Sequence, residues 1–260
     1  MAKAAWKKFP YADKAYVFTG AALKKNWERL HRGDREAFPA DAEVQEAWRL
    51  HHQGEFLKAL EAGLAAGLDG YNAANKAAMI YANYLETDDK RKLTLFQEIS
   101  ERCEELQQAQ PKNANAYYIQ AYALGRYSQG ISVIKALAQG LGGKIKAALE
   151  TAIKLDPKHA DAHSALGAYH AEVVDKVGAM IGKLTYGASK DVAVKHFETA
   201  LKLAPDSAIA CIEYANALVM LFGQARMDEA VKLYEKAAAA TPVDAMERLD
   251  VELAKSELED

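Results

Sequence analysis

Three histidines in the middle of the chain have a spacing that could support a metal site. His159 and His163 are four residues apart, and His163 and His170 are seven apart, so each pair would share one face of a helix. With a carboxylate such as Glu172 nearby, they could bind a divalent metal. His159 lies only two residues after Pro157, however, where a turn is expected. We therefore predict no metal here and interpret His163 and His170 as a buried or groove-facing pair.

A glycine-rich segment, Gly140-Leu141-Gly142-Gly143-Lys144, has the composition of a phosphate-binding loop. A Walker A loop also needs a glycine five residues before the Gly-Lys pair, and Ser or Thr after the lysine. Ala138 and Ile145 occupy those positions, so the glycines are better explained as a reversal between two helices. No serine lies in a recognisable nucleophile turn. We predict no catalytic residues, no cofactor and no enzymatic activity.

Four prolines mark the elements that must position these side chains. Each follows an alanine-rich amphipathic run, most clearly at 148–157 (ALETAIKLDP) and 196–205 (HFETALKLAP). No stretch of alternating β-branched residues lies between tight-turn dipeptides, so no strand is expected. Self-similarity of this kind indicates an all-α helical repeat array, and such arrays usually bind rather than catalyse. The four are Pro111, Pro157, Pro205 and Pro242.

Composition narrows the class of protein. Half of the 260 residues are hydrophobic and the net charge is −3, so we expect no nucleic-acid partner, which would need a dominant basic surface. Cys103 and Cys211 lack the spacing of a metal site or disulfide framework and are expected to be buried thiols. We find no apolar run as long as a membrane span and no secretory signal. We therefore predict no transmembrane segment and a cytoplasmic location.

Charge is distributed unevenly between the two ends. Residues 1–35 carry nine Lys or Arg and three acids, whereas residues 244–260 carry seven acids and two bases. The simplest interpretation is two solvated ends. The alternative is a homo-oligomer in which a basic end meets an acidic end of another copy.

Apolar periodicity predicts an opening helix over residues 12–31, about five helix pairs and an acidic C-terminal helix. The small residues of the first hairpin, such as Gly63, would let its helices pack closely. The last helix would cap the open end of the array. The predicted pairs are a hairpin at 42–68 with its turn at 53–56, then 72–85 with 91–110, 114–137 with 144–155, 160–182 with 189–203, and 207–222 with 228–240.

This pattern resembles the tetratricopeptide repeat (TPR) over about residues 40–242. The resemblance implies a right-handed α-α superhelix of helical hairpins, with an N-terminal helical segment at 1–38, a repeat domain at 39–242 and a C-terminal capping helix at 243–260. It is carried by Ala152, Leu155, Pro157, Ala162, Leu166, Gly167 and Tyr169 in one copy, by Ala200, Leu203, Pro205, Ala210, Tyr214 and Ala215 in another, and by Ala47, Gly54, Phe56 and Ala59 in the first hairpin.

The middle repeats are stretched. Proline intervals are 46, 48 and 37 residues against a usual unit of about 34. The surplus comprises two apolar inserts, near 127–143 and 173–190, which would lengthen the middle helices. Their apolar side chains are Ile131, Val133, Ile134, Leu137 and Leu141, then Val177, Met180, Ile181, Leu184 and Tyr186.

The stretched region, 121–205, looks like the regulator-of-microtubule-dynamics family. It is also similar to bacterial TPR proteins that serve tripartite solute transporters. The resemblance implies a curved module that binds partners and that, in some members, encloses an apolar pocket and handles lipids. Nothing in these residues indicates microtubules.

In a TPR array, the first helix of each pair lines a concave groove. Helical register places Val44, Trp48, Tyr118, Tyr122, Arg126, Ala168, Ile212 and Asn216 there. An alternative is that half of the tyrosines only pack between helices. The predicted groove lacks the repeated Lys/Asn set of members that bind chaperone tails, so we do not expect it to recognise an acidic peptide C-terminus. The candidate partner-binding residues are Trp48, Tyr118, Tyr122, Arg126, His163, His170 and Asn216.

We therefore predict a non-enzymatic scaffold that binds a protein or peptide in its concave groove. Tyr118, Tyr122 and Arg126 would anchor the partner, because aromatic rings supply contact area and arginine a directed hydrogen bond. The alternative is a carrier for a small apolar ligand or lipid, enclosed by the two inserts. The inserts could also be longer packed helices or an oligomer interface.

Overall fold

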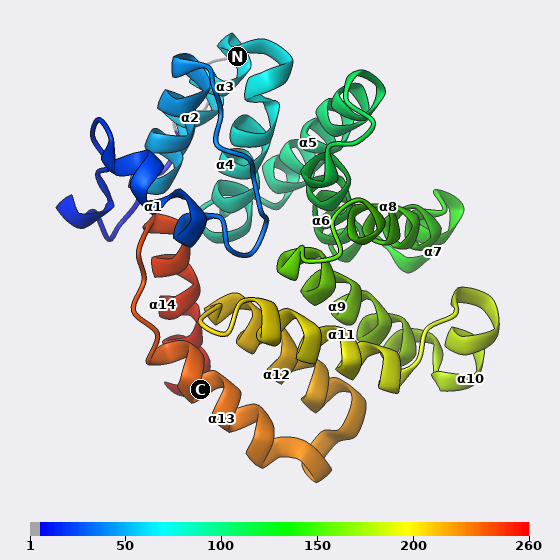
Figure 1. Ribbon diagram of the computed structural model, residues 1–260. Coiled ribbons are helices and arrows are strands. Elements are labelled where there is room, and N and C mark those ends of the chain that lie inside the picture. The colour runs from blue at the N-terminus through cyan, green and yellow to red at the C-terminus, as the bar shows by residue number, and fades with distance from the viewer. Residues whose placement is uncertain (1–5, 260) are drawn as a thin grey trace.

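The computed structural model describes residues 6–259, which form helices joined by turns and contain no strand. Figure 1 shows a curved array of antiparallel helix pairs. This confirms the all-α repeat architecture. The pairs are α2 (Ala42–Gln53) with α3 (Phe56–Ala65), α4 (Tyr71–Tyr84) with α5 (Asp89–Ala109), α6 (Ala114–Gln129) with α8 (Leu141–Leu155), α9 (Ala160–Val177) with α11 (Lys190–Leu203), and α12 (Ala208–Phe222) with α13 (Met227–Ala238). The other helices are α1 (Ala22–Leu30), α7 (Val133–Ala138), α10 (Ala179–Ile181) and α14 (Ala245–Glu259).

The four prolines share a local reason for their spacing. Each lies two residues before a side chain that accepts a hydrogen bond from the backbone at the start of the next helix. Such a cap satisfies a backbone N–H that has no partner within the helix and is worth about 1 kcal/mol. The proline ends one pair and the cap begins the next. The capping residues are Asn113, His159, Ser207 and Asp244.

Glycines allow close contact between α3 and α4. A Cβ built on Gly70 would lie 2.1 Å from the carbonyl oxygen of Gly63, and one on Gly63 would lie 2.7 Å from that of Gly70. Both distances are shorter than any real Cβ contact, and in both cases the neighbouring atom is a backbone oxygen, which cannot rotate away. The close contact at Gly63 is therefore with the start of α4, whereas the sequence placed it between the two helices of the first hairpin.

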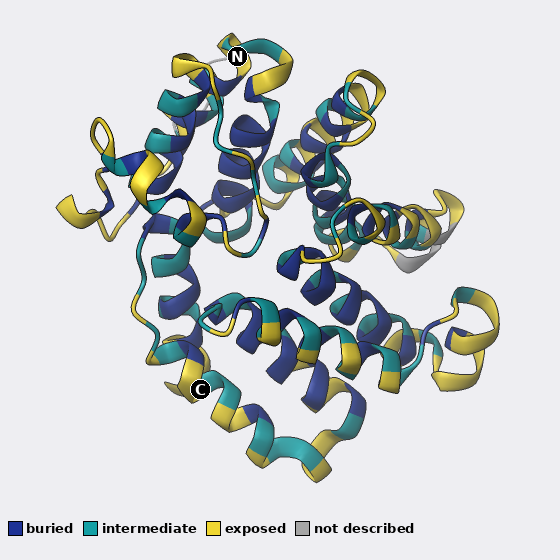
Figure 2. Ribbon diagram, in the orientation of Figure 1, coloured by how far each residue is buried: buried dark blue, intermediate teal, exposed yellow. Residues whose placement is uncertain are grey.

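The middle helices end earlier than the sequence predicted. Helix α6 stops at Gln129 and α9 at Val177, before Gly130 and Gly178. The first insert then forms the short α7, and the side chains of Val133, Ile134 and Leu137 lie outside the described residues. The second insert forms α10 and a π-helical turn, Gly182–Tyr186. Its apolar tip projects into solvent (Figure 2), with Met180, Ile181 and Leu184 exposed by 74%, 52% and 81%.

The two ends of the chain meet. The opening helix is shorter than predicted, a 3-10 turn at Lys14–Tyr16 followed by α1, because Gly20 takes a left-handed φ of 55° between them. Helix α14 covers the last pair, α12 and α13, and also packs on α2, so it closes the array into a ring (Figure 1). The basic N-terminal and acidic C-terminal regions therefore meet within one chain, as in the ion pair between Arg29 and Glu247.

Among the described residues, one stretch could cross a membrane by length and composition alone. It is Ala208–Ala238, whose most apolar window has a mean hydropathy of 1.4 and is 50% buried within the fold. The sequence analysis did not identify this stretch, because it runs through α12 and α13 across a turn at Gly223, where φ is 55°. Core helices pass the same test, so the stretch is weak evidence for a membrane span.

Candidate functional site

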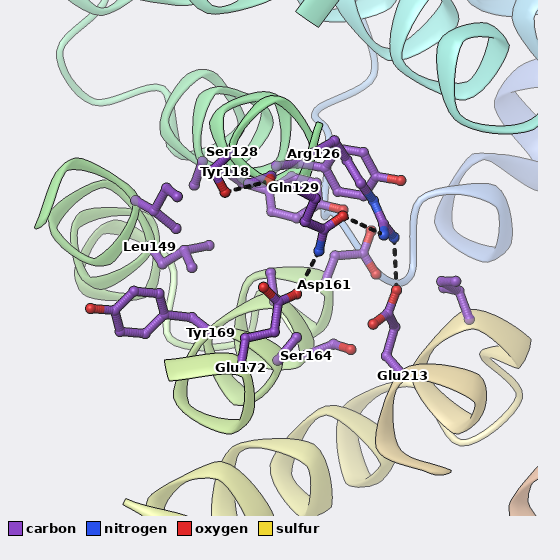
Figure 3. A pocket seen from close by; sticks show the side chains of 17 residues that line it. Tyr118, Arg126, Ser128, Gln129, Leu149, Asp161, Ser164, Tyr169, Glu172 and Glu213 are labelled. Carbon is purple, nitrogen blue, oxygen red and sulfur yellow. Dashed lines mark hydrogen bonds and ion pairs between the residues drawn. The ribbon is translucent and has the colours of Figure 1, made fainter. Parts of the chain in front are cut away.

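A hollow of about 110 Å³ opens to solvent between α6, α9 and α12, the first helices of three successive pairs (Figure 3). These helices are brought side by side by the repeat itself. Helix α8 contributes to the inner wall. The apolar floor is formed by Ala121, Ile145, Leu149, Ala165, Ala168 and Tyr169.

Polar side chains bridge the three helices at the edge of the hollow. Arg126 on α6 pairs with Glu213 on α12 at 2.9 Å, and its guanidinium lies 5.1 Å from the ring centre of Tyr122. Gln129 donates a 2.5 Å hydrogen bond to Glu172 on α9. Burial raises the pKa of the Tyr122 phenol, which therefore stays neutral at physiological pH. The edge can present both donors and acceptors to a ligand.

The structure brings together only part of the predicted groove. Tyr118, Tyr122, Arg126 and Ala168 line the hollow, as the register predicted. Trp48 does not, because α1 covers that face of α2 and leaves Trp48 1% exposed, with its ring edge-on to that of Trp27.

Two further predicted groove positions, both on α12, lie elsewhere. Ile212 packs against α13 and α14. Asn216 is exposed and accepts a hydrogen bond from Tyr234. The register on α12 was wrong, because Ile209 and Glu213 are the residues that face the hollow. Val44 is buried with Trp48 under α1.

The two predicted site histidines face the second helix of their own pair. His163 Nδ1 lies 2.9 Å from His196 Nδ1 on α11, and His163 Nε2 lies 3.1 Å from the carbonyl oxygen of Pro157. His170 stacks on His196 with ring centres 6.0 Å apart. Burial lowers the pKa of both His170 and His196 to about 4. The two predicted histidines therefore belong to a packing contact, and sequence spacing missed His196 because it lies on another helix.

A buried layer of polar side chains adjoins the hollow, and Tyr118, Tyr122 and Asp161 line both. The layer comprises Asp34, Glu36, Asn72, Lys76, Asn115 and Asp161. Asn72, Asn115 and Asp161 are each the second residue of the first helix of a pair. This recurrence is a signal that the sequence offers and that our prediction missed. Asn72, Lys76 and Asn115, none of which was among the predicted groove residues, belong to this layer.

The ionisable groups of this layer have shifted pKa values. Burial and the nearby Asp34 raise the pKa of Glu36 to about 8. The pKa of Asp34 is held well below its usual value by His31 and Lys76, although burial acts in the opposite direction. Asp34 is therefore ionised and Lys76 is its buried counter-charge, with Nζ 3.2 Å from Asp34 Oδ2.

A second buried cluster, His51, His52 and Asp244, is the set of described residues that could hold a metal ion. Their ligand atoms lie within 4.8 Å of one another, and the Nδ1 atom of His51 has no hydrogen-bond partner. Both oxygens of Asp244 are already engaged, one by His52 Nδ1 at 2.7 Å and the other by the backbone N–H of Glu247 at 2.8 Å. These two hydrogen bonds join α2 to the start of α14.

This cluster extends into the polar layer through His31. Its Nε2 lies 3.2 Å from His52 Nε2, and its Nδ1 lies 2.9 Å from Asp34 Oδ1. The contacts along Asp34–His31–His52–Asp244 form one buried chain that joins the polar layer to the start of α14, and burial lowers the pKa of His31 within it.

Comparison with known proteins agrees with this architecture. The family model described as regulator of microtubule dynamics protein 1-3 matches residues 44–259. A thermophilic TPR protein of Thermus thermophilus has a TM-score of 0.57 at 19% identity, covering 82% of this chain and 99% of that chain. YrrB, described as a TPR protein with an unusual peptide-binding site, has a TM-score of 0.41 at 15% identity, covering 93% of this chain and 99% of that one. The first likeness shows the fold, and the second is too distant to support an argument. No curated protein matches the chain.

Proposed function

This chain belongs to the family of regulator of microtubule dynamics proteins 1-3, and from that premise we propose that it is a non-enzymatic TPR-like scaffold that binds an extended peptide of a protein partner in its concave groove. The observation that carries the proposal is the hollow between α6, α9 and α12. It is open to solvent, apolar at its floor and ringed by hydrogen-bonding side chains. This is the usual composition of a site that takes one side chain and fixes its orientation.

The lining indicates what part of a peptide would enter. An apolar side chain fits the floor, because Leu149, Ala168 and Tyr169 offer no charge to pair with. At the edge, Arg126 and Gln129 can donate to a peptide carbonyl, and Glu172 can accept from a peptide N–H. Binding would exchange the present Gln129–Glu172 bond for bonds to the peptide, so its net gain rests on the buried apolar area.

The alternative ligand, an apolar small molecule or lipid, rested on enclosure by the inserts. Among the described residues, those that line the hollow include Ser128 and Gln129 from the first insert and none from the second. The carboxylates of Asp161, Glu172 and Glu213 also surround a single arginine there. This excess of negative charge would repel an anionic headgroup.

Gly125 allows the hollow to be blocked without disturbing the fold. A Cβ built on Gly125, which lines the hollow, meets nothing within 4 Å. Gly125→Leu should therefore fill the space, whereas Gly143→Leu on exposed α8 surface is a matched control because its Cβ is also unobstructed. We expect peptides selected from a random display library against the wild type to bind G125L at least tenfold more weakly and G143L unchanged.

The selected peptides would be measured by fluorescence polarisation on the full chain. The proposal fails if no peptide is enriched, or if the enriched peptides bind G125L as tightly as the wild type. Native mass spectrometry of protein purified without detergent tests the alternative. A retained acyl-chain ligand that G125L displaces would favour the lipid carrier instead.

A further inference from the structure

The segment from Arg29 to Glu36, which leads from α1 toward α2, lies along the concave side of the array. The backbone N–H of Asp161, at the start of α9, donates a 3.1 Å hydrogen bond to the carbonyl oxygen of Gly33. A Cβ on Gly33 would lie 2.2 Å from Asp161 Oδ1, so the segment touches α9 as closely as glycine permits. Arg35 adopts a left-handed φ of 52°, a strained conformation that its surroundings must hold in place.

Two carboxylates of this segment are held by first helices of the repeat pairs. Glu36 Oε2 accepts hydrogen bonds from Asn72 Nδ2 on α4 at 2.9 Å and from Asn115 Nδ2 on α6 at 2.6 Å. Asp34 Oδ2 accepts from Lys76 Nζ on α4 at 3.2 Å. Asn72, Lys76 and Asn115 are 6%, 3% and 6% exposed. Buried polar groups of this kind are costly unless paired, so the array carries a built site for two acidic side chains, of which Asp34 is ionised and Glu36, with its pKa raised to about 8, is protonated at neutral pH.

Arginines of the same segment hold it at the edge of the array. Arg32 pairs with Asp206 at 2.8 Å, before α12, and Arg35 pairs with Asp156 at 2.8 Å, before α9. The side chains of Arg32 and Arg35 are 40% and 48% exposed. Exposed pairs are each worth at most about 1 kcal/mol, so the edge contacts are weak compared with the buried carboxylates.

The segment and its site differ in their relation to the family. The family model begins at Val44, so Asp34 and Glu36 lie outside the matched region. Asn72, Lys76 and Asn115 lie inside it. The carboxylate-binding side chains therefore belong to the matched repeat region, whereas the carboxylates that fill the site come from the segment that precedes it.

We infer that Asn72, Lys76 and Asn115 form a second subsite of the groove for an extended peptide with two carboxylates two residues apart, and that Asp34 and Glu36 fill it in place of a partner. The inference rests on the proposed function, because the subsite adjoins the hollow through Tyr118, which lines the hollow and whose ring centre lies 5.3 Å from Lys76 Nζ. Because the Arg29–Glu36 segment is part of the same chain, it competes with a partner peptide at a high effective concentration. A partner peptide therefore binds in proportion to the fraction of molecules whose segment is released.

The test supplies the carboxylates in trans. The full chain with D34A and E36A loses both occupants but keeps Lys76 paired with Asp161 at 3.5 Å. The probe is a fluorescent peptide with the sequence of residues 29–38, RLHRGDREAF, and its control is the amide peptide RLHRGNRQAF. We expect D34A/E36A to bind the acidic peptide at least tenfold more tightly than the wild type does, and at least tenfold more tightly than the amide peptide. Adding N115A should abolish this preference.

Equal binding of the acidic and amide peptides to D34A/E36A overturns the inference, as does equal binding of the acidic peptide to D34A/E36A and the wild type. If D34A/E36A does not fold, R32E/R35E replaces it, because those side chains are exposed and their loss weakens only the edge contacts. R32E/R35E is then compared in the same two ways, with the acidic against the amide peptide and against the wild type. Library peptides that depend on Gly125 would still bind if this inference failed, so its failure is distinguishable from that of the proposed function.

Discussion

At the scale of single residues, the burial of Asp250 has the clearest consequence for how the stability of the fold depends on pH. It lies on α14, is 3% exposed and accepts a hydrogen bond from the Tyr84 hydroxyl. Burial, with Glu247 and Asp244 nearby, raises its pKa from 3.8 to about 8. Between these two values the folded chain binds the proton more tightly than the unfolded chain does. The free energy of unfolding therefore falls as the pH rises through this window.

Replacing Asp250 with asparagine should remove this contribution. One group contributes at most about 1.4 kcal/mol per pH unit, and Glu36, whose pKa is also raised to about 8, acts with the same sign. The amide oxygen of the new side chain can still accept the Tyr84 hydrogen bond, so D250N should be more stable than the wild type at pH 8 and show a shallower decline from pH 4.5 to 8. Urea unfolding across this range measures the slopes, with E36Q as a second variant. Parallel slopes for D250N and the wild type would contradict the assignment.

At the scale of elements, the contact between Gly63 and Gly70 sets the spacing of α3 and α4. Gly70→Ala would force a Cβ against a backbone oxygen, which cannot rotate away. We expect a loss of about 1–3 kcal/mol in the free energy of unfolding, as for other overpacked sites. Gly143→Ala is the control, because its Cβ meets no atom and alanine favours a helix by about 1 kcal/mol. Thermal and urea unfolding should move in opposite directions for the two variants, and a neutral G70A would show that the helices separate at little cost.

The exposed tip of the second insert should contribute to association rather than to folding. Met180, Ile181 and Leu184 are mostly exposed, so replacing all three with serine removes little buried area. We expect the Tm to change by no more than about 2 °C, since surface substitutions usually shift stability by less than about 0.5 kcal/mol. Retention on a hydrophobic column should fall. A matched triple substitution at buried Leu149, Leu166 and Leu218 should unfold the protein, and a comparable loss from the tip variant would mean that the tip packs on the fold.

Helices and turns were predictable from sequence where the determinant is local. The prolines and their caps place the start of α6, α9 and α12, and Tyr118, Tyr122 and Arg126 come together because one helix carries all three. Other site residues depend on partners far away in the chain. The environment of Trp48 is set by α1, and Asn72 and Asn115 acquire a role only because Glu36 crosses from another segment. Periodicity within a helix cannot report which distant element covers its face.

At the scale of the whole molecule, closure of the array depends on the start of α14. Asp244 caps α14 through the backbone N–H of Glu247 and also accepts from His52 on α2, so the same carboxylate joins the last helix to the first pair. Arg29 adds an ion pair to Glu247 from α1. A repeat array normally transmits stability only between neighbouring pairs. Here the first and last pairs are also coupled to each other.

Asp244→Ala should therefore have an effect at both ends of the chain. It removes a cap worth about 1 kcal/mol and leaves the buried His52 ring nitrogen without its hydrogen-bond partner, which costs about 1–3 kcal/mol. Asp88→Ala is the matched control, because Asp88 caps α5 through Arg91 N–H and is exposed. Hydrogen exchange should speed up in α1, α2 and α14 of D244A, while D88A should change α5 alone. If exchange in D244A rises only in α14, the contact does not couple the ends, and the array behaves as an open superhelix whose ends merely touch.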